Sequence, residues 1–140
     1  MDFIMKGLKR TLRFNYPREW SGHYNGNPIK ENQYFLGFTD MLRDLSKMIS
    51  GDNLKMIEIG SYMGESTMMF GSSDIFKEIH CIEPFTGQEE FNQMYNYTWD
   101  EVENEFKINT RFFDNIILHK DFSYNVNNNF KDNDYDFIYV

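Results

Sequence analysis

Apolar residues recur along the chain with two different spacings, one typical of helices and one typical of buried strands. From Asn32 to Ile49, apolar side chains return every three or four residues, which predicts an amphipathic helix. Shorter apolar runs have the length of strands that are covered on both faces. These predicted strands occupy residues 54–59, 78–83, 115–121 and 135–140.

Local signals indicate where the other helices begin and end. Thr98 followed by Glu101 has the spacing of a capping box, so a helix is predicted to begin there. A shorter helix is predicted from Glu65 to Phe70, with Gly71 as its end. The asparagine-rich stretch at 125–134 is predicted to be a loop.

Strands that alternate with helices predict βαβ units and a parallel sheet, and therefore an α/β fold. The length of 140 residues fits one domain, which we assign to residues 32–140. Residues 1–31 are predicted to be a basic N-terminal arm. Its basic side chains outnumber its acids within the first eighteen positions: Lys6, Lys9, Arg10, Arg13 and Arg18 against Asp2.

Charge and composition narrow the class of protein. The net charge of −8 disfavours nucleic acid as the main partner. No stretch approaches the ~20 apolar residues that a membrane-spanning helix needs, so no membrane partner is predicted. The single cysteine, Cys81, cannot form an intramolecular disulfide, and the first residues lack the apolar run of a signal peptide. A cytoplasmic protein is predicted.

The turn after the first predicted strand, "EIGSYMGEST", is the first candidate binding site, because ligands of open parallel sheets bind at the carboxyl ends of the strands. Gly60 and Gly64 allow the backbone to bend sharply or to approach a ligand closely. Neither the dinucleotide pattern nor the nucleoside triphosphate pattern is present. Glu65 stands where a phosphate loop carries lysine, so a ligand without phosphates is favoured.

A sulfonium nucleoside with an amino-acid tail meets these requirements, and S-adenosylmethionine is such a ligand. Its carboxylate suits a helix N-terminus and the hydroxyl of Ser66. Glu83 ends the second predicted strand, about twenty residues after the turn, where a carboxylate can accept hydrogen bonds from both ribose hydroxyls. The alternative for Glu83 is an exposed acid at a strand end.

Four strand-end motifs, "IEIGSYMGEST", "IHCIEPF", "HKDFS" and "YDFIYV", together resemble the class I S-adenosylmethionine-dependent methyltransferases. They are most similar to the branch of small-molecule O-methyltransferases that includes catechol and macrocin O-methyltransferases. The resemblance covers residues 54–140. It implies a Rossmann-like fold in which the partial parallel sheet has the strand order 3-2-1-4, with flanking helices.

The resemblance also implies which residues bind the cofactor. The first motif would surround the methionine part, with Ser66 on its carboxylate; Glu83 would hold the ribose. Pro84 and Phe85 would flank the adenine, and Asp121 and Ser123 would lie by its edge. Tyr62 and Phe85 could equally be packing aromatics. The full implied set is Glu58, Gly60, Ser61, Tyr62, Gly64, Ser66, Glu83, Pro84, Phe85, Asp121 and Ser123.

In the resembling family an Asp and then a His follow the fourth strand, and in many members the Asp binds a divalent metal or the acceptor. These positions would lie beyond Val140, so we expect the sequence to be truncated and the catalytic half to be absent. No catalytic residue is assigned: His80 and His119 fall inside predicted strands, and His23 lies in a predicted loop. No metal-ligand spacing is present in the chain.

The predicted activity is therefore O-methylation of a small molecule or sugar, with this chain carrying the cofactor-binding half. Two alternatives remain: another nucleotide-binding Rossmann-type enzyme, such as an NAD-dependent one, and a non-catalytic interaction module. A fourth strand as apolar as "FIYV" would be a bare edge in the 3-2-1-4 sheet, and such an edge invites pairing. We therefore expect instability, or a homo-oligomer or aggregate formed through residues 135–140.

Overall fold

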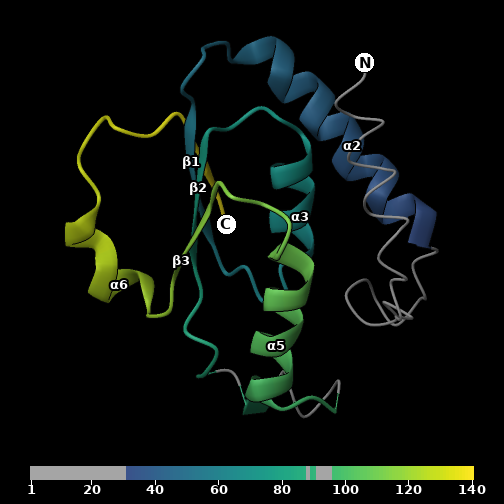
Figure 1. Ribbon diagram of the computed structural model, residues 1–140, viewed down its shortest axis with the longest axis vertical. Helices are drawn as coiled ribbons and strands as arrows, with labels where there is room; N and C mark the ends of the chain where they lie inside the picture. The colour runs from purple at the N-terminus through teal and green to yellow at the C-terminus, as the bar shows by residue number, and fades with distance from the viewer. Residues whose placement is uncertain (1–30, 88, 91–95) are drawn as a thin grey trace.

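The computed structural model is an α/β fold in which helices cover both faces of one sheet (Figure 1). It describes residues 31–87, 89–90 and 96–140, with only the backbone described for 31–37 and 39. The predicted basic arm and His23 lie outside these residues, apart from the backbone of residue 31. Among the helices described, none combines the length and the apolar character needed to cross a membrane.

All four strands are parallel and lie in the order β3-β2-β1-β4, which confirms the predicted order. Each strand is shorter than predicted by one to three residues. Their bounds are β1 Lys55–Ile59, β2 Glu78–Ile82, β3 Ile116–His119 and β4 Phe137–Tyr139. Glu83 thus lies one residue beyond β2, at the edge where β1 also ends.

Helices α2 (Glu31–Met48), α3 (Glu65–Ser72) and α5 (Trp99–Thr110) cover one face of the sheet. Figure 1 shows α6 (Ser123–Val126) on the opposite face, where the 3-10 helix η1 (Asn127–Asn129) continues it. The periodic pattern at 32–49 is confirmed as helix α2. The Thr98 and Glu101 capping box is also confirmed, with both reciprocal hydrogen bonds present.

The larger of two apolar cores lies between the sheet and α2, α3 and α5. Phe70 is fully buried at its centre, and its ring makes edge-on or tilted contacts at centroid distances of 5.1 Å to Phe38 and 5.2 Å to Tyr139. Such aromatic contacts fix the geometry of a core as well as burying area. Ile57, Ile82 and Val126 form the smaller core on the opposite face.

Two predictions of local structure were wrong. Gly71 does not end α3, because the helix continues to Ser72 and is followed by Ser73 in a right-handed conformation. Gly71 instead gives room to Phe113: a Cβ on it would lie 2.8 Å from that ring. The asparagine-rich stretch is not all loop, since Asn125 and Val126 belong to α6 and Asn127–Asn129 form η1.

Candidate functional site

In the turn after β1, every second residue has a left-handed backbone conformation. The backbone φ angles are +84° at Gly60, +47° at Tyr62 and +78° at Gly64. The N–H of Gly60 donates to the carbonyl of Ile82 at 3.0 Å, and the N–H of Gly64 donates to the carbonyl of Ser61 at 2.8 Å. The first bond holds the turn against the end of β2, and the second lies within the turn. Tyr62 is strained there, because side chains rarely adopt this conformation.

The two glycines of the turn have different surroundings. A Cβ on Gly60 would meet no atom within 4 Å, whereas a Cβ on Gly64 would lie 2.9 Å from the ring of Phe106. Gly64 therefore permits close packing of the turn on α5. Asn109 of the same helix adds a buried hydrogen bond, donating to the carbonyl of Met63 at 2.9 Å. Gly60 is the position that a ligand could approach closely.

Glu58, in β1, supports this turn through side-chain hydrogen bonds. Its carboxylate is fully buried and accepts hydrogen bonds from the hydroxyls of Ser61, at 2.9 Å, and of Ser66 and Thr67. Burial raises the pKa of Glu58, while the three hydroxyl donors act in the opposite direction. The arrangement fastens the first turn of α3 to the end of β1.

The same buried group includes the thiol of Cys81, whose sulfur lies 3.7 Å from the Glu58 carboxylate. Burial and the neighbouring acid together raise the pKa of this thiol well above its usual range. Cys81 therefore stays protonated, and it acts as a weak donor rather than as a nucleophile.

Ser66 is the residue that the resemblance assigns to a ligand carboxylate. Its hydroxyl proton points to Glu58. A hydroxyl has one proton but two acceptor lone pairs, so in this arrangement Ser66 can accept from a ligand ammonium. Donating to a ligand carboxylate would require that proton to turn away from Glu58. The role of Ser66 stays a prediction.

Glu83 faces the turn and binds it directly. Its two carboxylate oxygens accept from the N–H groups of Tyr62, at 2.8 Å, and Phe85, at 3.0 Å. Both partners have left-handed backbones, with φ of +47° and +52°. Glu83 is only 6% exposed, and burial raises its pKa although the two N–H bonds lower it. This carboxylate therefore holds two strained peptide groups at the mouth of the sheet.

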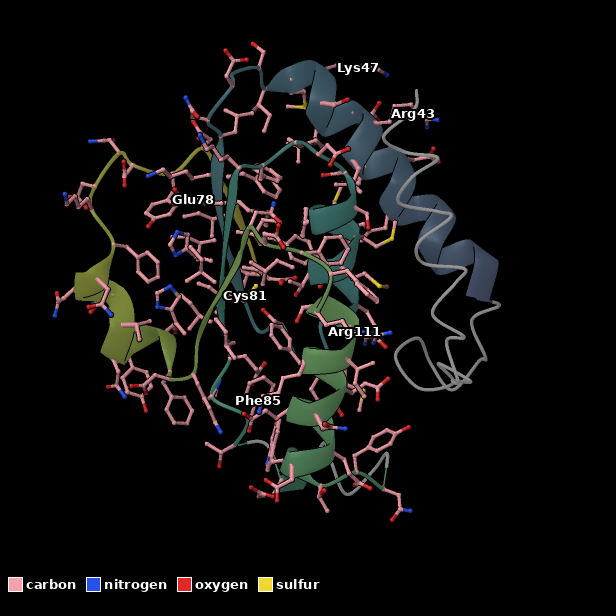
Figure 2. The ribbon with its side chains drawn as sticks, viewed as in Figure 1. Arg43, Lys47, Glu78, Cys81, Phe85 and Arg111 are labelled. Carbon is pink, nitrogen blue, oxygen red and sulfur yellow. The ribbon has the colours of Figure 1, made fainter. Side chains whose placement is uncertain are left out.

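The residues that follow Glu83 pack against α5. Figure 2 shows Phe85 beside this helix, and its ring makes an edge-on contact with Phe106 at a centroid distance of 5.7 Å. The Nζ of Lys120 lies 5.9 Å from the centre of the Phe85 ring. Phe85 is 5% exposed, so packing accounts for most of its surface, and Pro84 is half-buried.

Asp121 and Ser123 follow β3, at the same edge of the sheet as Glu83. The carboxylate of Asp121 accepts from the N–H of Phe122 and from the side chain of Asn125, both at 2.7 Å, and these bonds lower its pKa. Ser123 is the first residue of α6. The backbone carbonyl of His119 joins the two strand ends, because it accepts from the N–H groups of Glu83, at 3.1 Å, and Asp121, at 2.9 Å.

The structure thus brings the predicted site residues to one edge of the sheet, in the turn after β1 and the ends of β2 and β3. Within the described ranges, no group of three or more His, Cys, Asp or Glu side chains is arranged to hold a metal ion.

The sequence did not identify Asn109 as a support of the turn. An asparagine on the buried stripe of a helix does not indicate which distant carbonyl its side chain will bind. No protein-family model and no curated protein matches this chain.

Proposed function

We propose that this chain carries the cofactor-binding part of an S-adenosylmethionine-dependent methyltransferase that acts on an oxygen of a small molecule or sugar. One observation carries the proposal: the carboxylate at the end of β2 lies against the glycine turn after β1, with Glu83 accepting from the N–H of Tyr62 at 2.8 Å. An acid in that position can hold a ribose whose nucleoside continues along the strand ends.

The Glu83 carboxylate retains the capacity to accept from a ribose. Each of its oxygens accepts one backbone N–H, and a carboxylate oxygen has two lone-pair sites. Two further positions therefore remain for the 2′- and 3′-hydroxyls. Ribose donors would add to the backbone donors and stabilise the charged form of an acid whose pKa burial raises.

The turn itself favours a ligand without phosphates. Gly60 offers open space for close approach, while Glu65 begins α3 as a buried acid, 5% exposed. A pyrophosphate beside this carboxylate would be a like-charge contact, costing on the order of a few kcal/mol in a poorly screened site. An ammonium and sulfonium group would meet Ser66 and the acidic side chains of the turn with favourable charge.

The chemistry implied is simple for the protein. When bound, S-adenosylmethionine supplies a methyl group that is already activated for in-line displacement. The residues of this chain would bind and orient the nucleoside and the amino-acid tail, which fixes the direction in which the methyl group points. No group of this chain is assigned as the base for the acceptor. The single cysteine is free and buried, which fits a reducing, cytoplasmic location.

The proposal is tested by calorimetric titration of the 140-residue chain with S-adenosylhomocysteine, its 2′-deoxy analogue and NAD. We expect S-adenosylhomocysteine to bind and NAD not to bind. Loss of the 2′-hydroxyl should weaken binding by about tenfold, the equivalent of one hydrogen bond to a charged group. Binding of NAD alone would support another nucleotide-dependent enzyme, and binding of neither would support a non-catalytic module.

A variant separates the ribose contact from the structural role of Glu83. In Glu83→Gln, the penalty for removing the 2′-hydroxyl should shrink, because an amide has one accepting oxygen where the carboxylate has two. The same change at the exposed Glu90, Glu90→Gln, should leave the penalty intact. An equal penalty in wild type and Glu83→Gln would contradict the ribose role, even if both proteins bind the ligand.

A further inference from the structure

A histidine pair lies on the face of the sheet opposite α3 and α5, away from the candidate site. His80 of β2 and His119 of β3 are stacked, with ring centroids 5.2 Å apart and 23° between the ring planes. The Nδ1 of His80 lies 2.9 Å from the Nε2 of His119. This distance is that of a direct hydrogen bond between the two rings.

Two aromatic rings cover the pair. Phe130 makes edge-on contacts with both histidines, at centroid distances of 5.7 Å to His80 and 5.1 Å to His119. Tyr135 makes an edge-on contact with His80 at 5.3 Å and with Phe130 at 5.4 Å. We call Phe130 and Tyr135 the aromatic cover. Both belong to the segment that connects η1 to β4.

Charged groups lie beside the pair. The Nε2 of His80 lies 3.3 Å from the Glu78 carboxylate. Glu78 is itself 3.7 Å from the Nζ of Lys55, which also reaches Asp134 at 3.4 Å. Tyr135 is the titratable group of the cover, and α6 and η1 contribute no charged residue.

Proton counting sets a limit on this pair. A hydrogen bond between two imidazole nitrogens needs one proton between them, and it survives when one ring is charged. When both rings are charged, each facing nitrogen carries a proton, so two N–H groups point at each other across 2.9 Å. The bond is then lost and two cations repel each other beneath an apolar cover.

We propose that His80 and His119 act as a pH-sensitive switch. The pair takes up one added proton and keeps the hydrogen bond between its rings. Entry of a second added proton charges both rings, separates them and opens the aromatic cover. Burial, and next the charge on His80, lower the pKa of His119, which agrees with a second proton that enters late. The unfolded chain takes up that proton near the ordinary value of 6.5. Acid below this value therefore destabilises the folded state.

The switch is tested by following the ring nitrogens of His80 and His119 by NMR in the 140-residue chain as pH falls. We expect two macroscopic protonation steps separated by more than about one pH unit, the sign of strongly coupled sites. Proton contacts between Phe130 and the two rings should persist through the first step and disappear in the second. Overlapping steps, or a cover that stays closed through the second step, would overturn the proposal.

His119→Phe is the informative variant, because it keeps an aromatic ring but cannot take up a proton. Its free energy of unfolding should lose the part of the acid-dependent fall that is expected to begin below pH 6.5, above the range in which the carboxylates titrate. Glu78→Gln is the companion variant: it should lower the pH of the first step and leave both steps present. If His119→Phe does not fold, the wild-type titration alone decides. An unchanged acid-dependent fall in His119→Phe would contradict the switch.

Discussion

The left-handed positions of the glycine turn illustrate how single residues shape this site. Gly60 and Gly64 have similar φ angles, yet only Gly64 lies against another side chain, the ring of Phe106. Sequence spacing alone gives both glycines the same meaning. Their difference arises because α5 packs on one end of the turn and not on the other.

This difference predicts unequal effects of alanine at the two positions. Gly60→Ala should cost about 1–2 kcal/mol, the strain of a side chain in left-handed backbone. Gly64→Ala adds a contact of 2.9 Å with Phe106, so overpacking should add a further ~1–3 kcal/mol. Denaturant unfolding of both variants checks the order. Equal losses in the free energy of unfolding would mean that α5 shifts to accommodate the added methyl group without further cost.

At the scale of helices and strands, local signals predicted starts better than ends. The capping box at Thr98 is present as predicted, since its donors and acceptors lie within four residues of each other. The end of α3 was not predictable in the same way. Gly71 has the sequence signature of a helix end, but Phe113, more than forty residues away, decides its surroundings.

The start of α5 offers a direct test of local stabilisation. Thr98→Ala removes the side-chain acceptor for the N–H of Glu101 and should destabilise the protein by about 1 kcal/mol. Thr98→Ser keeps the hydroxyl and should restore most of the loss. Thermal unfolding monitored by circular dichroism measures both. A serine variant as unstable as the alanine variant would assign the effect to packing of the threonine methyl group.

The capping box should also respond to pH. Hydrogen bonds from Thr98 lower the pKa of Glu101 below its ordinary value of 4.5. The bonded carboxylate therefore stabilises the fold above that value, and its contribution is lost as pH falls through the lowered pKa. The stability difference between wild type and Glu101→Gln should accordingly shrink in acid. A difference that stays constant with pH would contradict this role.

At the scale of the whole molecule, the outer strand β4 leaves one edge of the sheet open to association. Among the described residues, β4 pairs with β1 on one side and has no strand on the other. Ile138 of this strand is 58% exposed and Val140 is 86% exposed. An apolar strand with unpaired backbone groups is a template for pairing with another chain. The expected homo-oligomer through residues 135–140 is therefore still a prediction.

A charge on the edge strand tests that prediction. We expect the chain to associate with rising concentration and Ile138→Lys to prevent this, because a charged side chain on an edge strand opposes pairing. Ile117→Lys provides the control: Ile117 is also partly exposed, at 39%, but lies on β3 at the opposite edge. Light scattering after size-exclusion chromatography gives the mass. A wild-type monomer at all concentrations would refute the prediction.

The sequence by itself determined the fold class and the edge of the sheet where the candidate site lies. These follow from periodicity and from the positions of polar residues at strand ends, which are local properties repeated along the chain. The strand order was implied by the family resemblance that the strand-end motifs carry. It also placed Glu83 beside the turn, since parallel strands bring their carboxyl ends together. The hydrogen bond from the N–H of Tyr62 to Glu83 was not predicted.

Only the tertiary structure decided what each polar group binds. Glu58 and Ser66 are eight residues apart, and their hydrogen bond depends on how α3 sits against β1. His80 and His119 are thirty-nine residues apart and meet because β2 and β3 pair in one register. Such contacts depend on directions fixed by packing, and a one-residue shift in register would abolish them.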